Sequence, residues 1–274
     1  VQWCSRKMLE KIAENSLSFN RNIHMHFLET IYQRHWLDKE FPNGVTKYLD
    51  DIGFLSSRLS LAHCIYLREE EMEILAERGV TIVINSSSNL IVSSGLASVA
   101  KMLERGCKVA MGLDGLAFDE DEDSVREMRL TYNLHKALGF NRYITKDQIQ
   151  TIAMQNGYRV ITKKRAGGSL KVGQPADFLS LNWKKLSQEL IEPIENPLDL
   201  VLAKGTKHFI NGLVVNGREV VKNSKVETVD LPLLENELFA VIRSKIGETS
   251  TLRKIMPELK EAYEKYYCGQ WHCC

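Results

Sequence analysis

The stretch Leu75-Ala-Glu-Arg-Gly-Val-Thr-Ile-Val-Ile-Asn85 decides the fold class of this chain. Its first residues close an amphipathic helix, Gly79 ends that helix, and an almost purely apolar run follows. A continuous run of Val and Ile is typical of a parallel strand that is buried on both faces. The same plan returns in Leu103-Glu-Arg-Gly-Cys-Lys-Val109, one βα repeat later. Strands that alternate with helices of this length predict a parallel α/β sheet.

Four strands of this kind are predicted before residue 115. A helix over 4–19 precedes the first strand, and helices over 45–52, 68–78 and 96–105 lie between the strands. The strands are expected at Asn22–Phe27, Leu59–His63, Val80–Asn85 and Cys107–Leu113. Four βα units are half of a (β/α)8 TIM-type barrel, and half a barrel leaves two strand edges unpaired. We therefore expect a partial barrel made of the last four strands. The other four would stand upstream or come from a second chain.

The residue pattern changes twice along the chain, near residues 167 and 226. We therefore predict three parts: a barrel half over 1–166, a small β-domain segment over 167–225 and a helical tail over 226–274. Gly167-Gly168 opens a stretch rich in turns and short apolar runs, and Asn216-Gly217 is a hairpin signal. The expected elements are helices at Ser124–Leu138 and Lys146–Gln155, short strands at Val201–Ala203, Lys207–Ile210 and Leu213–Val215, and a helical tail at Leu233–Tyr267 with breaks near Gly247 and Pro257.

The bulk composition is that of an ordinary globular protein. The chain has 274 residues, 44% hydrophobic and 26% charged, and a net charge of +1. Such a balance gives no basis for nucleic-acid or membrane partners. Without a secretory signal, the six cysteines are expected to be reduced in a cytoplasmic protein. The Cys268–Cys274 tail could hold a metal, but a terminal segment that packs or frays is the favoured reading.

Polar side chains stand where the predicted strands end. His26 and Glu29 follow the first strand, His63 ends the second, and Asp114 follows the fourth. The carboxyl ends of parallel strands meet at one edge of a sheet, where barrel enzymes build their active sites. Two imidazoles and two carboxylates could bind a divalent metal there and move protons around its water. The sequence therefore predicts a metal-dependent hydrolase.

The ordered set of motifs resembles the carboxyl-terminal part of the amidohydrolase superfamily, in the branch of heterocycle deaminases and triazine chlorohydrolases. The resemblance covers roughly residues 1–225. Its motifs are His26-x-x-Glu29-Thr30, Ala62-His63-Cys64, Ser88-Asn89-Leu90, Gly112-Leu113-Asp114-Gly115 and Gly173-Gln-Pro-Ala-Asp177. Two of them depart from the usual pattern: no Pro precedes Ser88, and Leu113 stands where Thr or Ser is usual.

The resemblance implies a role for each strand-end residue. His26 and Asp114 would be ligands of one divalent metal ion, Zn or Fe. His63 would orient the attacking water, Glu29 would shuttle protons to the substrate ring, and Asp114 would also accept the proton of the water. The family's other two ligands form a His-x-His pair on the first barrel strand. His24-Met-His26 is not that pair, because it lies too few residues before Asp114 for seven βα units.

The function that the resemblance implies is hydrolytic deamination of an aminated purine, pterin, pyrimidine or triazine. A chlorohydrolase acting on a halogenated ring is an alternative within the class, and a catalytically incomplete structural partner is an alternative outside it. The small-molecule pocket is expected to involve Gln2, Trp3, Phe27, Asn89 and Phe118. Asn89 could instead fix a loop, and His24 could be a hydrogen-bonded core residue. A homo-oligomer is possible. The motif of the cytidine-type zinc deaminases is absent from the sequence.

Overall fold

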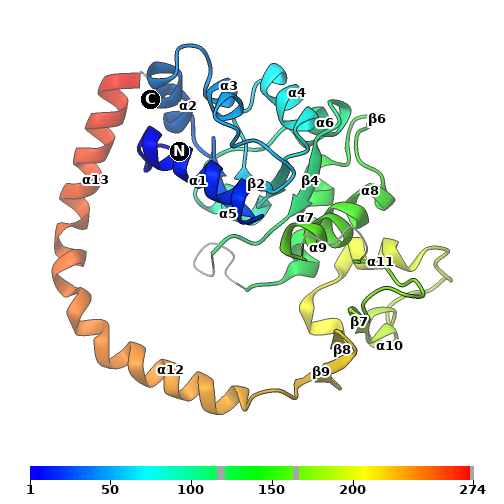
Figure 1. Ribbon diagram of the computed structural model, residues 1–274. Coiled ribbons are helices and arrows are strands. Elements are labelled where there is room, and N and C mark those ends of the chain that lie inside the picture. The colour runs from blue at the N-terminus through cyan, green and yellow to red at the C-terminus, as the bar shows by residue number, and fades with distance from the viewer. Residues whose placement is uncertain (116–120, 163–166, 272–274) are drawn as a thin grey trace.

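A four-stranded parallel sheet organises the first half of the chain (Figure 1). The computed structural model describes residues 1–115, 121–162 and 167–271. The strands are β1 (Ile23–Phe27), β2 (Leu59–His63), β3 (Thr81–Ile84) and β4 (Lys108–Met111), paired in that order. All three pairings are parallel, with His26 opposite Ala62 and Val83 opposite Ala110. The predicted α/β class and the four strands are confirmed.

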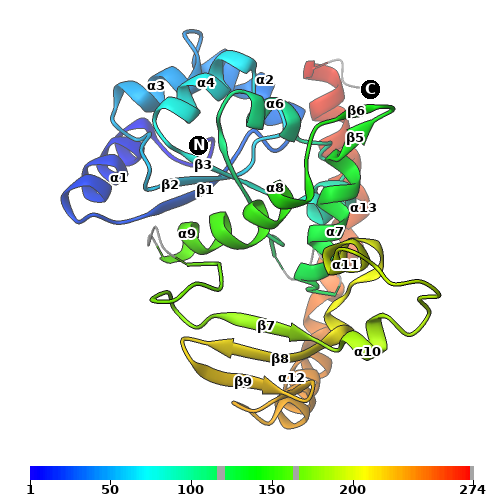
Figure 2. The same cartoon turned by 90° about the vertical axis from the view of Figure 1, so that its right-hand side faces the viewer.

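Six helices accompany these strands, and several of them cover one face of the sheet. They are α1 (Arg6–Ser18), α2 (Ile31–Glu40), α3 (Val45–Asp51), α4 (Glu69–Glu77), α5 (Ser86–Ile91) and α6 (Val99–Glu104). Figure 2 shows α2, α3, α4 and α6 together on one side of the sheet. Leu61, Ile82 and Val109 from three neighbouring strands are almost completely buried, in one cluster with Leu75 of α4 and Met102 of α6. This cluster is the core that holds the strand ends in place.

Two of these helices were not predicted. Helix α2 begins at Thr30, whose hydroxyl accepts a hydrogen bond from the amide of Gln33. Its sequence has too few regularly spaced apolar residues to predict a helix. Helix α5 begins directly after β3, in the run Ser86-Ser-Ser-Asn89, where low helix propensity argues against a helix. Tertiary contacts override propensity in this segment.

Four helical segments and a two-stranded hairpin follow the sheet. They are α7 (Ser124–His135), β5 (Ala137–Leu138), β6 (Asn141–Arg142), α8 (Lys146–Gln150), the π-helix η2 (Thr151–Asn156) and α9 (Gly157–Thr162). The prediction that the first of these helices runs to Leu138 was wrong by three residues, because Ala137 and Leu138 pair with β6. The side chain of Asn156 donates a 2.7 Å hydrogen bond to the carbonyl of Val109 in β4.

A second, antiparallel sheet forms the next part of the chain, with α10 (Trp183–Leu186), α11 (Pro197–Lys204) and the 3₁₀ turn η3 (Lys207–Phe209). Its order is β10 (Lys225–Val226), β9 (Arg218–Lys222), β8 (Ile210–Val215) and β7 (Phe178–Leu181). The β8–β9 hairpin turns through Asn216 and Gly217, both with positive φ, as predicted. The expected strand at Val201–Ala203 was wrong: these residues belong to α11, which Asn196 caps. The strand expected at Lys207–Ile210 is a 3₁₀ turn up to Phe209.

The chain closes with two long helices, α12 (Leu231–Lys245) and α13 (Ser250–Trp271), joined by the 3₁₀ turn η4 (Ile246–Thr249). The predicted break near Gly247 is confirmed by this turn, whereas α13 continues through Pro257. In Figure 1 the two helices form an arc that leaves the small sheet and returns to α2. Within the described residues, no helix is both long and apolar enough to cross a membrane.

Candidate active site

The carboxyl ends of β1, β2 and β4 bring the four predicted chemical residues to one edge of the sheet. His26 lies in β1, Glu29 follows it, His63 is the last residue of β2, and Asp114 follows β4. Left-handed backbone, rare for residues other than Gly, occurs at each of these strand ends: φ is +50° at Leu28, +72° at His63 and +69° at Asp114. These abrupt turns direct the side chains toward a common point.

His26, His63 and Asp114 form a cluster that could hold a metal ion. One ligand atom from each lies within 4.8 Å of the others. Nε2 of His26 is 3.7 Å from Oδ1 of Asp114, and Nε2 of His63 is 3.7 Å from Oδ2. The two imidazole rings stack with centroids 5.2 Å apart. Two nitrogens and one carboxylate oxygen are donors that suit zinc.

Asn89 fixes the orientation of the His63 ring. His63 is fully buried, and its Nδ1 lies 2.7 Å from Oδ1 of Asn89. Because that oxygen accepts, Nδ1 carries the proton and Nε2 faces Asp114 and Glu29. Nε2 has no hydrogen-bond partner among the described residues. A buried nitrogen left in this state needs a ligand or a water, so the cluster is built around an additional group.

Asp114 is held as a carboxylate. Burial raises the pKa of this side chain, but two other influences together outweigh it. The hydroxyl of Ser88 donates a 2.6 Å hydrogen bond to Oδ2, and the imidazoles of His63 and His26 lie nearby. The net effect is a lowered pKa. Asp114 is therefore ionised at neutral pH, as a metal ligand must be.

Glu29 is placed between the cluster and solvent. Its Oε2 lies 3.9 Å from Nε2 of His63, and its side chain is 21% exposed. The hydroxyl of Ser94 lies 3.4 Å from Oε1, and the amide of Glu29 donates to the side chain of Gln33. A carboxylate that touches both the buried imidazole and solvent is suited to carrying protons.

His24 lies on the same face of β1 as His26 but serves a different purpose. Its Nδ1 is 2.7 Å from the hydroxyl of Ser60 on β2. Burial, followed by the charges of His26 and His63, lowers its pKa. His24 is thus hydrogen-bonded, as one of the two interpretations of the sequence expected, but it is exposed at the strand surface and its assignment to the core was wrong.

The predicted substrate-pocket residues are scattered. Phe27 is 1% exposed and belongs to the core, so its assignment to a pocket was wrong. Trp3 is 90% exposed, and Gln2 is half-buried. Asn89 is 1% exposed and contacts His63. Phe118 lies outside the described residues.

Sequence reasoning missed α5 and its contact with the predicted helix α7, which together support this edge. Helix α7 is fixed to α5 by Oε1 of Glu127, which accepts the amide of Ser87 at 3.1 Å, and by the 2.8 Å contact between the hydroxyls of Thr131 and Ser86. Glu127 and Thr131 are fully buried. The next residues of α5 are Ser88 and Asn89, which hold Asp114 and His63. The polar run of α5 after an apolar strand was the available signal.

We expect Asn89→Ala to release the His63 ring and lower turnover of the complete enzyme by about 10- to 100-fold, the range for residues that orient a metal-site histidine. Asn89→Asp keeps an acceptor for Nδ1 of His63, so its loss of turnover should be smaller. Imidazole ¹⁵N shifts of His63 check the cause: Nδ1 should be protonated in the parent protein and mixed in Asn89→Ala. Leu90→Ala, one residue on and 44% exposed, is the control. An unchanged tautomer in Asn89→Ala would contradict the assignment.

Comparison with protein families and curated proteins finds amidohydrolases and deaminases. The model of the amidohydrolase family matches residues 2–220. The chain is 33% identical over 229 residues to 5'-deoxyadenosine deaminase of Methanosarcina barkeri, covering 83% of this chain and 52% of that protein. It is 31% identical to 5-methylthioadenosine/S-adenosylhomocysteine deaminase of Thermodesulfovibrio yellowstonii, covering 84% and 52%. The chain thus spans about half the length of these relatives.

Solved structures share the fold. A zinc-bound adenosine deaminase from Xanthomonas campestris matches with a TM-score of 0.79 and 23% identity, over 85% of this chain and 53% of that one. Atrazine chlorohydrolase from Arthrobacter aurescens, complexed with zinc, matches with a TM-score of 0.74 and 21% identity, over 87% and 52%. At these identities the likeness shows the fold alone.

Proposed function

The chain belongs to the amidohydrolase family, and we propose that it supplies the carboxyl-terminal half of a barrel enzyme that hydrolytically deaminates an adenine nucleoside. One observation carries the proposal: His26, Glu29, His63 and Asp114, from three strand ends, converge on one point. In this view β1 to β4 are the last four strands of the barrel. The first four, with the His-x-His pair, come from a segment that this chain does not span.

The residues fit a divalent metal ion, for which we propose zinc. His26 and Asp114 would hold it, and the ionised state of Asp114 suits that role. The unpartnered Nε2 of His63 supports a further polar group at the same point. Two ligands fall short of the three protein ligands usual for catalytic zinc. The remainder would come from the absent half.

The proposed reaction replaces a ring C–N bond by a C–O bond, with water supplying the oxygen and ammonia leaving. When bound, a divalent ion lowers the pKa of its water from about 15.7 to about 7, which makes hydroxide available at neutral pH. Asp114 would accept a proton from the attacking water. His63, with Nε2 toward the cluster, orients the attacking oxygen. Glu29 carries a proton to the ring nitrogen or to the leaving amine.

The substrate proposal rests on the relatives. Both curated proteins described above are named as deaminases of adenine-bearing compounds. Glu29 beside a buried imidazole suits protonation of the basic ring nitrogen next to the electron-poor carbon that carries the amine in such a substrate. Cys4, Cys64 and Cys107 are free thiols, and we propose a cytoplasmic location in line with them.

The test is an ammonia-coupled assay of the complete enzyme over 5'-deoxyadenosine, 5'-methylthioadenosine, adenosine, an aminopterin-type ring and a halogenated triazine. Ammonia release from the adenine nucleosides is the expected result. Chloride release from the triazine alone would replace the deaminase assignment with a chlorohydrolase. Failure on every compound, with metal loaded, would favour a structural partner.

Glu29→Gln should lower kcat by about 10²- to 10⁴-fold and leave the metal content unchanged, because Glu29 is assigned to proton transfer and not to ligation. Elemental analysis beside the ammonia assay separates the two roles. Glu14→Gln, on the exposed surface of α1, is the matched control. Loss of metal from Glu29→Gln would show that Glu29 is a ligand.

A further inference from the structure

The two carboxyl-terminal helices form a distinct structure, which we call the arm: residues 231–267 of α12, η4 and α13. The family match ends at residue 220, so the arm lies beyond the part of the chain that the family model covers. Its function is therefore not given by that match.

Apolar side chains run along both helices of the arm at the spacing of one helix face. In α12 they follow at intervals of four residues and in α13 at intervals of four and three. We call this set the seam: Leu234, Leu238, Ile242, Leu259, Tyr263 and Tyr266. Every member is exposed, from 41% at Leu259 to 56% at Leu238. An exposed apolar stripe of this length marks an interaction surface.

The arm is fixed at both ends. At its start, the amide of Glu227 donates to the carbonyl of Val220 in β9, just before α12 begins. At its end, the ring of Tyr267 lies against that of Tyr32 in α2, with centroids 4.5 Å apart. Figures 1 and 2 both place the arm at the border of the molecule between these points. The arm is therefore an arch that starts at the small sheet and ends against α2, the helix that follows β1.

The parallel sheet has two outermost strands, and η2 partly covers the outer edge of β4, where Asn156 donates to the carbonyl of Val109. In the sheet order, β1 and β4 are the outermost strands, each with one strand neighbour. Solved structures that share this half at TM-scores of 0.74 to 0.79 have about as much chain again beyond the matched part. An exposed parallel edge and an exposed helix seam on one molecule call for a partner that covers both.

We propose that the arm is a docking surface for the four-stranded βα half that completes the barrel, and that its seam packs on the helices of that half. The proposal rests on the proposed function for the existence of the half. A second copy of this chain is the rival occupant. It would bring a second set of His26, His63 and Asp114 and no His-x-His pair, so it would leave the metal cluster as incomplete as before.

The test co-expresses tagged residues 1–274 with the amino-terminal half of the Methanosarcina barkeri deaminase, the part of that relative that this chain does not span. The amount of half-barrel captured through the tag is measured. Leu238→Glu with Ile242→Glu places two carboxylates in the seam. Asn236→Glu with Ala240→Glu places two at the same spacing on the opposite face of the same helix, also exposed.

We expect capture of the half-barrel by the parent chain and by the Asn236/Ala240 control, and a loss of capture of about 100-fold or more in the seam variant, because charges buried against an apolar face are strongly unfavourable. Amide hydrogen exchange over 231–267 should slow on capture. Lack of capture, equal capture by both variants, or unchanged exchange in the arm would overturn the proposal. So would a dimer of 1–274 alone that the seam variant converts to monomer. None of these readouts uses substrate, so failure of the deaminase assignment would leave them unaffected.

Discussion

Asp114→Asn is expected to reduce turnover of the complete enzyme by about 10³-fold or more, the loss that follows when a charged group at the reacting centre is removed. The change keeps the size of the side chain and the acceptor for Ser88, so the fold should persist. It removes the negative charge that faces His26 and His63 at 3.7 Å. Metal content should fall together with turnover.

Ammonia release, elemental analysis and urea unfolding check this result together. Asp51→Asn, on the exposed surface of α3, is the control and should leave all three unchanged. Near-normal turnover in Asp114→Asn would remove Asp114 from the proposed chemistry. A large loss of stability would show that Asp114 is chiefly structural.

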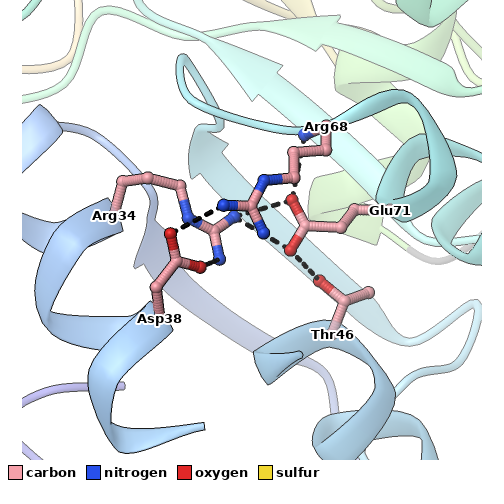
Figure 3. A network of polar contacts seen from close by, with 5 residues as sticks. All are labelled: Arg34, Asp38, Thr46, Arg68 and Glu71. Carbon is pink, nitrogen blue, oxygen red and sulfur yellow. Dashed lines mark hydrogen bonds and ion pairs between the residues drawn. The ribbon is translucent and has the colours of Figure 1, made fainter. Parts of the chain in front are cut away.

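The second large effect concerns a buried ion pair behind the sheet. Figure 3 shows Arg34 of α2 facing Glu71 of α4, with Nη1 of Arg34 2.9 and 2.8 Å from the two carboxylate oxygens. Their side chains are 6% and 7% exposed. Thr46 of α3 also donates to Glu71, and Asp38 accepts from both Arg34 and Arg68. The network therefore ties α2, α3 and α4 together.

Arg34→Met should lower the free energy of unfolding by about 3–5 kcal/mol, because it leaves the Glu71 carboxylate buried without its partner. The double variant Arg34→Met with Glu71→Leu should lose less free energy of unfolding than Arg34→Met, because it removes both charges. Urea unfolding measures both. Arg78→Met breaks the surface pair with Asp50 and should leave the free energy of unfolding nearly unchanged. A double variant less stable than Arg34→Met would contradict this account.

The parallel sheet was predictable because its strands carry the strongest local signal in the chain. The runs ending at His63 and Asn85 are apolar, short and bounded by glycine or polar turns, so periodicity and length agree. Val201–Ala203 has the same local composition but is helical, because Asn196 and Pro197 begin a helix there. A short apolar run can form either a strand or a helix, and at Val201–Ala203 the N-cap Asn196 followed by Pro197 favours the helix.

The residues of the candidate site were predictable for a related reason. In a parallel sheet the register places all carboxyl ends at one edge, so His26, His63 and Asp114 were expected on the same side of the sheet. Their approach to within 4.8 Å was not given by register, because β1 and β4 are the outermost strands. The residues that orient them could not be found this way. Glu127 reaches Ser87 across 40 positions, and no local pattern encodes that contact. The pocket assignment of Phe27 failed because adjacent residues of a strand point to opposite faces.

The left-handed backbone at Leu28, His63, Cys64 and Asp114 has a consequence for how this protein tolerates change. Each such residue costs the folded state about 1–3 kcal/mol, and Gly would relieve most of that cost. Leu28 and Cys64 are fully buried in the core, where Gly would leave a cavity that offsets the relief. In a random library selected only for heat resistance, Gly or Asn should therefore accumulate at Asp114 first, which is partly exposed. At 63 and 114 the same substitutions remove the imidazole and the carboxylate. Selection for stability would thus favour replacing these residues, whereas selection for catalysis would favour keeping them.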